Sequence, residues 1–297
     1  MKTNESRYQI KDRCLRHMVA TLRQTKPLLV PYPHFWTENI LPEDIYDRIL
    51  AELPDTSLYL FNTEPGRHYM NRGDMHLLSE KLDQLPDDSR ELWYGIRLTL
   101  AMPELKQAIF KNRSAGFAHR FGIPAEEASG IEAYPRPMLY RETEGYNIAP
   151  HPDTRRKLAT VQIALTDDPL QSDLGTSLYR LSAYPIDLLQ APRGFRRVAR
   201  HPFTRNSMFA FSVVNTITMR SWHGREPLPA GCGIRCSKCT TQMRKMVTRR
   251  LWRKCEPAER PPSRSAHLKF RVAKLVKSLL IYCVFATRSG ARDLVAF

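Results

Sequence analysis

The hydrophobic pattern changes its period once along the chain, near Ile131, and this change constrains the fold more than any other feature. Before it, apolar residues recur every three to four positions, as on a helix that buries one face. After it, short β-branched or aromatic runs alternate with turn residues, as in antiparallel strands. The sequence therefore predicts an α+β protein, with a helical N-terminal half followed by an antiparallel β half.

Several elements can be placed by this pattern. The helix expected within residues 1–30 carries Ile10, Cys14, Leu15, Met18 and Leu22 on one face. A second helix begins after Pro42, which suits a first turn, and stops before Pro54. Further helices are expected over 87–112 and, in short form, near 124–129, and strands over 132–143, 158–168, 175–181 and 207–222.

Positive charge is concentrated at the C-terminal end. The chain has 297 residues and a net charge of +16, but Arg235 to Phe297 alone contains 16 Lys and Arg against 3 Asp and Glu. The first 234 residues are nearly neutral, as in an ordinary enzyme. A basic tail can bind nucleic acid or an acidic membrane surface. Nucleic acid is the less favoured partner, because the tail has no recognised motif and no interleaved aromatic residues.

From the sequence we expect neither a signal for export nor a segment for membrane insertion. It has no run of 18 apolar residues, which a spanning helix requires. Its N-terminus is polar and lacks the apolar segment of a signal peptide. Six cysteines in 297 residues do not suggest a secreted disulfide scaffold. We expect a cytoplasmic protein without a transmembrane span.

A candidate metal centre combines His151, Asp153 and His223. Two imidazoles and one carboxylate form the ligand set of non-haem Fe(II) sites, which keep the other face of the octahedron open. In a strand end, His151 and Asp153 would project from the same face, because alternate residues point the same way. His223 follows an apolar run predicted to be a strand. These residues are predicted to be both metal ligands and catalytic, and the alternative is a β-domain with surface histidines.

Further residues give this pattern a family resemblance. Tyr140, Gly145, His151-x-Asp153, His223 and Arg235-x-Ser237 resemble the 2-oxoglutarate/Fe(II)-dependent dioxygenase superfamily, in its prolyl-4-hydroxylase-like branch. The resemblance spans about residues 30–237. It implies a double-stranded β-helix, or jelly roll, flanked by N-terminal helices, and it implies Fe(II), O2 and the co-substrate 2-oxoglutarate.

The resemblance also assigns roles in co-substrate binding. Arg235 begins 12 residues after His223, where the family places the cation that pairs with the C5 carboxylate of 2-oxoglutarate. Ser237 would add a hydrogen bond to that carboxylate. Arg225 is a second candidate for the cation, although it lies closer to His223. Tyr140 would contact the co-substrate or, equally, serve as a packed strand aromatic.

The chain departs from the family after Arg235. There the family has an apolar strand that closes the β-helix, whereas this chain continues with charged residues in poor alternation. The closing strand is therefore not recognisable, and residues 238–297 are expected to form a basic, poorly ordered tail. This tail is either a native extension or the product of a shifted reading frame. Within it, Leu268–Ala286 is expected to be helical, packed on the body or lying on a membrane surface.

Three domains and three candidate functions follow from these observations. The expected domains are an N-terminal helical extension (1–30), a dioxygenase-like domain (31–237) and the tail (238–297). The first function is an oxygenase that hydroxylates a small molecule, a sugar-linked group or a peptidyl side chain. The alternative is an inactive oxygenase-fold binding protein whose tail contacts nucleic acid or an acidic membrane. A cupin-type isomerase or sugar-binding protein would share the β-barrel architecture. The sequence names neither the substrate nor the oligomeric state.

Overall fold

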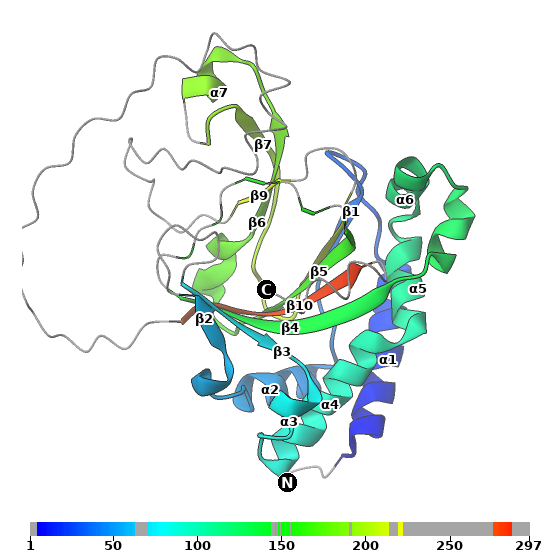
Figure 1. Ribbon diagram of the computed structural model, residues 1–297, viewed down its shortest axis with the longest axis vertical. Helices are drawn as coiled ribbons and strands as arrows, with labels where there is room; N and C mark the ends of the chain where they lie inside the picture. The colour runs from blue at the N-terminus through cyan, green and yellow to red at the C-terminus, as the bar shows by residue number, and fades with distance from the viewer. Residues whose placement is uncertain are drawn as a thin grey trace, which may run out of the picture. The chain divides into compact units, whose positions relative to one another are not determined.

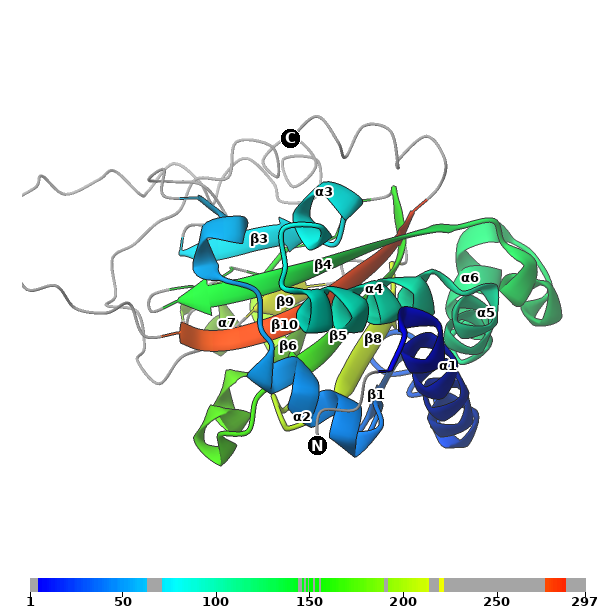
Figure 2. The same ribbon diagram turned by 90° about the horizontal axis from the view of Figure 1, so that it is seen from below.

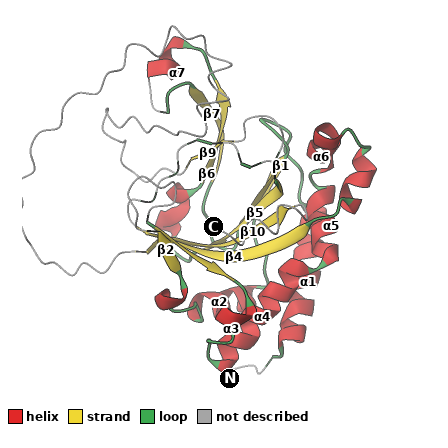
Figure 3. Ribbon diagram, viewed as in Figure 1, coloured by secondary structure: helices red, strands yellow, loops and turns green. Residues whose placement is uncertain are grey.

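A computed structural model of the chain describes residues 5–62, 71–143, 146, 148, 150, 151, 153, 154, 156–189, 192–213, 219–221 and 276–286. These residues all belong to one compact unit, which is assembled from Met1–Gly224 and Lys274–Phe297. Within this unit, helices cover one face of a large antiparallel sheet, and a small antiparallel sheet lies on the other side (Figures 1 and 3).

The helices that cover the large sheet come from the N-terminal half, as predicted. They are α1 (Arg7–Gln24), α2 (Glu43–Ala51), α3 (Ser79–Leu82), α4 (Asp87–Ala101), α5 (Pro103–Lys111) and α6 (Ser114–Phe121). One more short helix, α7 (Pro185–Leu189), and three 3-10 turns also occur in the described chain, the turns being η1 (Thr56–Leu58), η2 (Ala125–Gly130) and η3 (Pro169–Leu174).

Local sequence explains where these helices begin and end. A capping box between Ser6 and Gln9 starts α1, whose predicted apolar face is buried at Ile10, Cys14, Met18 and Leu22. The helix predicted over 87–112 is interrupted at Met102, which is extended. The interruption has a physical cause, because the residue before a proline, here Pro103, disfavours helical geometry. The chain resumes as α5 with that proline in its first turn.

The strands form two antiparallel sheets. The large sheet has the order β1-β8-β5-β10-β4-β3-β2, and the small sheet has the order β7-β6-β9. Their bounds are β1 (His34–Thr37), β2 (Leu60–Asn62), β3 (Arg72–His76), β4 (Tyr134–Thr143), β5 (Lys157–Leu165), β6 (Thr176–Leu181), β7 (Phe195–His201), β8 (Met208–Ser212), β9 (Met219–Ser221) and β10 (Val276–Ala286).

The path of the chain between the two sheets makes this fold a double-stranded β-helix. After β4 and β5 in the large sheet, the chain crosses to β6 and β7, returns to β8, crosses again to β9, and comes back to the large sheet in β10. The four strands at the centre of the large sheet, β8-β5-β10-β4, are neighbours in space, although most are distant in sequence. The predicted α+β jelly roll flanked by N-terminal helices is therefore confirmed.

Strand β10 corrects the expectation for the C-terminal region. Residues within Leu268–Ala286 were predicted to be helical, but Val276–Ala286 form a strand that pairs with β4 on one edge and β5 on the other (Figure 2). This strand occupies the closing position of the β-helix, which the sequence pattern failed to reveal. Residues 238–275 and 287–297 lie outside the described part of the chain, and the predicted domain boundaries stay predictions.

The helix prediction failed because β10 is buried on both faces of the large sheet. Alternate residues of β10 face the helices, where Leu279, Ile281, Cys283 and Phe285 join the main core. The others lie on the opposite face of the large sheet and join a second cluster, through Leu280, Tyr282, Val284 and Ala286. A strand that is buried on both faces is a continuous apolar run, which periodicity alone cannot distinguish from a buried helix.

Candidate functional site

The candidate site is centred on Asp153, which precedes β5 on the inner side of the β-helix. Its Oδ1 accepts a hydrogen bond from Lys157 Nζ at 2.8 Å, and its Oδ2 accepts one from Thr160 Oγ1 at 2.8 Å. Both charged side chains are largely withdrawn from solvent, with 9% of Asp153 and 16% of Lys157 exposed. The strand therefore holds both oxygens of this carboxylate in a fixed orientation.

Opposite charges stabilise each other within this pair. Burial alone would raise the pKa of Asp153, but Lys157, His151 and the Thr160 hydrogen bond together hold that pKa below its ordinary value. Burial opposes the charge on Lys157, yet Asp153 and neighbouring tyrosines raise the pKa of this ammonium well above its ordinary value. At neutral pH the site thus contains a carboxylate and an ammonium, with the imidazole of His151 close enough to act on the carboxylate.

Two stacked tyrosines extend the site across the sheet. Lys157 Nζ lies 3.4 Å from the hydroxyl of Tyr282 on β10. The Tyr282 ring stacks on Tyr140 of β4, with centroids 4.5 Å apart. The guanidinium of Arg72 on β3 also lies over the Tyr140 ring, 3.9 Å from its centroid. A continuous row of contacts thus joins Asp153 to Arg72 across four adjacent strands.

The charge of Arg72 at the far end of this row is already neutralised. Its Nε and Nη2 donate to the two oxygens of Asp74 at 2.6 and 2.7 Å, which is the bidentate geometry that guanidinium and carboxylate favour. Its Nη1 lies 3.5 Å from the Tyr146 hydroxyl. Only 6% of the Arg72 side chain is exposed. Asp74 therefore holds the Arg72 guanidinium in place at the end of this row of contacts.

The structure describes three of the predicted site residues. Asp153 and His151 lie close together, and Tyr140 joins them through Tyr282 and Lys157. Predicted residues His223, Arg235 and Ser237, together with Gly145 and Arg225, lie outside the described residues. Within the described chain no cluster of three His, Cys, Asp or Glu residues forms, so the described ligand set holds two of the three predicted members.

The described donors fit a divalent metal in their chemistry. A buried carboxylate and a neighbouring imidazole are ligands that Fe(II) accepts. Thr160 provides the hydrogen bond that orients a ligating carboxylate in many metal centres. The ammonium of Lys157 occupies one carboxylate oxygen, and a metal would have to share or replace that contact.

Sequence reasoning missed Lys157, Thr160, Tyr282 and Arg72. A signal existed for Thr160, which with Gln162 breaks an otherwise apolar strand at a spacing of two. Lys157 lies four residues after Asp153, but this spacing does not predict a contact unless the conformation of the loop between them is known. Tyr282 belongs to the strand that was expected to be a helix. Arg72 carried no signal.

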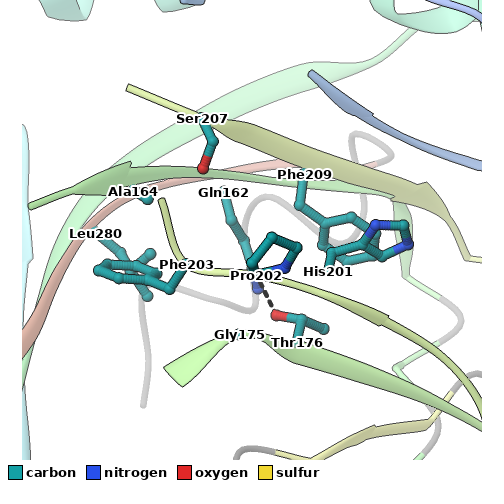
Figure 4. A pocket seen from close by; sticks show the side chains of 10 residues that line it. All are labelled: Gln162, Ala164, Gly175, Thr176, His201, Pro202, Phe203, Ser207, Phe209 and Leu280. Atoms are coloured by element: carbon teal, nitrogen blue, oxygen red, sulfur yellow. Dashed lines mark hydrogen bonds between the residues drawn. The ribbon is translucent and has the colours of Figure 1, made fainter. Parts of the chain in front are cut away.

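A small cavity is lined by residues of both sheets (Figure 4). Its polar lining includes Gln162 and Thr176, which are hydrogen bonded to each other at 3.0 Å, and Ser207 and His201. A volume of about 20 Å³ holds a single water molecule and no organic ligand. His201 Nε2 has no hydrogen-bond partner among the described residues, so a water there would satisfy it.

Comparison with solved structures finds prolyl hydroxylases among the similar folds. A prolyl-4-hydroxylase from Pseudomonas putida is 10% identical, with a TM-score of 0.46, and the match covers 91% of this chain and 99% of that one. A prolyl hydroxylase from Trichoplax adhaerens, solved with a hypoxia inducible factor oxygen degradation domain peptide fragment, is 9% identical with a TM-score of 0.43, covering 99% and 98%. No family model and no curated protein matches the chain.

Proposed function

We propose that this protein is an Fe(II)- and 2-oxoglutarate-dependent oxygenase. One observation carries the proposal: a buried carboxylate, Asp153, is oriented on the inner side of a double-stranded β-helix beside His151. In that proposal His151, Asp153 and His223 hold the metal, and the substrate is a small molecule, a sugar-linked group or a peptidyl side chain.

Each of the described residues of the candidate site would have a role in this activity. Bound Fe(II) would supply the activation of oxygen, at the expense of 2-oxoglutarate. His151 and Asp153 would hold the metal from one side, and Thr160 would keep the Asp153 carboxylate from rotating. Tyr140, Tyr282 and the apolar residues around them exclude water from the interior. This exclusion strengthens every electrostatic contact within the site.

Anaerobic titration with Fe(II) and then 2-oxoglutarate tests the proposal. The expected result is a visible charge-transfer band that requires both additions. His151→Ala and Asp153→Asn should abolish the band, because each removes a ligand. His119→Ala is the matched control, since His119 is exposed on α6 and should leave the band unchanged. A full band in either ligand variant would contradict the assignment.

The ion pair between Lys157 and Asp153 favours a second candidate, an oxygenase-fold binding protein without metal. A buried ammonium can neutralise the carboxylate permanently and leave no use for iron. In this alternative the full-length protein binds no Fe(II), Mn(II) or Co(II), while it stays folded. Titration of the protein with these metal ions in a calorimeter separates the two candidates.

Among the described helices, none is long and apolar enough to cross a membrane.

A further inference from the structure

An exposed apolar surface lies at the end of the hairpin formed by β6 and β7, where α7 connects the two strands (Figure 1). No residue of α7 is buried. Its aliphatic side chains and the tyrosine before it are 44–76% exposed, and we call these residues the apolar tip: Tyr184, Ile186, Leu188 and Leu189. A contiguous group of exposed apolar side chains is typical of a binding surface.

The carboxylate within the apolar tip is turned away from solvent, while the aliphatic side chains are turned toward it. Asp187 lies in the middle of α7, and only 14% of its side chain is exposed. Its carboxylate accepts hydrogen bonds from the Ser182 hydroxyl and from Arg196 Nε, the second at 2.8 Å. Its backbone carbonyl accepts one from the Gly194 amide at 2.7 Å. These contacts hold the tip in a conformation that is the reverse of an ordinary solvated surface.

Positive charge surrounds the apolar tip. Residues 180–200 contain five arginines and one acidic residue, Asp187. Two of these arginines form ion pairs with described carboxylates, namely Arg196 and Arg200. Arg193 and Arg197 are exposed, and no carboxylate of the described residues pairs with them. The hairpin therefore keeps unneutralised cations close to exposed aliphatic side chains.

An anionic lipid surface complements both properties. Aliphatic side chains can enter the boundary between headgroups and acyl chains, while guanidinium groups stay among the lipid phosphates. A second copy of the chain is a poorer occupant, because a two-fold interface would place the same arginines against one another. An acidic protein would match the charge, but protein interfaces are anchored by Trp, Tyr and Arg more than by leucine.

We propose that the end of the β6–β7 hairpin binds anionic phospholipid membranes. Leu188 and Leu189 insert among the lipids, and Arg193 and Arg197 bind lipid phosphates. None of the residues proposed to hold the metal belongs to this surface, so membrane binding is independent of the proposed function. Because salt screens the attraction between exposed charges, binding falls as the ionic strength rises.

Vesicle binding by the full-length protein tests the role of the hairpin. The vesicles contain phosphatidylcholine alone or with about one third phosphatidylserine, and bound protein is separated by flotation. The wild type should bind the mixed vesicles at least about tenfold more tightly than the neutral ones. Leu188→Ser/Leu189→Ser and Arg193→Gln/Arg197→Gln should each weaken binding to the mixed vesicles by about tenfold or more.

Matched double variants elsewhere on the surface serve as controls. Leu60→Ser/Leu78→Ser replaces two leucines that are as exposed as those of the tip. Arg16→Gln/Arg23→Gln removes two exposed arginines of α1. Both controls should bind the mixed vesicles like the wild type.

Insertion is measured separately, because the basic segment after Arg235 can also attract anionic vesicles. Leu189→Trp should gain fluorescence that is quenched by lipids brominated on their acyl chains, after correction for the four native tryptophans. Leu60→Trp is the control, and its added fluorescence should not be quenched. Quenching at position 189 therefore reports contact of the tip with the acyl chains, whatever the basic segment does.

Each outcome supports or overturns the proposal. Failure of the wild type to bind the mixed vesicles, unchanged binding by the leucine variant, or absence of quenching in Leu189→Trp overturns it. Dimers of the wild type in sedimentation equilibrium that Leu188→Ser/Leu189→Ser abolishes, without vesicle binding, would make the hairpin a contact between copies. Binding of polyglutamate through Arg193 and Arg197, again without vesicle binding, would assign the surface to an acidic protein. Arg193→Lys/Arg197→Lys keeps both charges and should retain vesicle binding.

Discussion

At the scale of single residues, Arg113 has an environment that opposes its charge. It lies between α5 and α6 with 1% of its surface exposed, and its guanidinium stacks on the Phe35 ring at 4.7 Å. None of its three guanidinium nitrogens has a hydrogen-bond partner in the part of the chain that the structure describes. Burial lowers the pKa of Arg113 to about 9. A cation in an apolar core without an anion destabilises the folded state.

Replacement of Arg113 by methionine should therefore stabilise the protein. The fall of the Arg113 pKa from its ordinary value in the unfolded state to about 9 in the folded state corresponds to roughly 5 kcal/mol at pH 7. Contact with Phe35 offsets part of it. This cost is fully present below the folded-state pKa and declines as the pH rises from about 9 toward the ordinary pKa of arginine. We expect Arg113→Met to raise the free energy of unfolding by about 1–4 kcal/mol in urea titrations at pH 7.

The matched control is Arg16→Met on the exposed face of α1, which should change stability by less than about 0.5 kcal/mol. Raising the pH to about 10 should narrow the difference between wild type and Arg113→Met, because the folded protein can then lose the buried charge. A destabilised Arg113→Met would indicate that the guanidinium is satisfied by a group outside the described residues.

At the scale of secondary structure elements, β10 shows how far the sequence predicts this fold. Helices with one polar face, such as α1 and α2, were located correctly because their burial follows a period of 3.6. Strands β4 and β8 were found through β-branched and aromatic runs. β10 was not, because both of its faces are buried and it follows a long charged segment in the sequence.

The residues of the candidate site also differ in whether the sequence could predict them. His151 and Asp153 were predicted as ligands from residue type and short spacing, and their role as ligands stays a prediction. Lys157, Tyr282 and Arg72 join the site only through strand pairing, which brings β5, β10, β4 and β3 side by side. No local pattern in the sequence specifies that order. The register between strands that are distant in sequence is set by packing of the whole sheet.

The contribution of β10 to stability can be measured at Ile281. This side chain is 1% exposed and packs in the main core beneath the helices. Ile281→Ala should lower the free energy of unfolding by about 2–5 kcal/mol, because it removes buried methyl groups and leaves a cavity. Ile186→Ala on α7, where the isoleucine is 52% exposed, is the control and should have a small effect. Equal effects of the two substitutions in thermal denaturation would argue that β10 is not part of the folded sheet.

At the scale of the whole molecule, one folded unit is made from two separate stretches of chain. Met1–Gly224 and Lys274–Phe297 belong together, although Arg225–Ala273 separates them in sequence. The second stretch supplies the strand between β4 and β5. Since β10 has a hydrogen-bonded neighbour on each edge, its removal would expose two strand edges and their apolar surroundings. We therefore expect folding to require the residues of β10.

Cleavage of the chain between these stretches tests this arrangement. A specific protease site inserted after Ser265 would allow the connection to be cut in the native protein. We expect the two pieces to elute together in size-exclusion chromatography and to separate only in denaturant, because residues 279–286 are all buried and paired on both sides. A chain that ends at Leu275 should by contrast be insoluble or unfold without cooperativity. If the piece that ends at residue 265 remained folded and soluble on its own after the cut, with an unchanged melting transition, β10 would not be integral to the sheet.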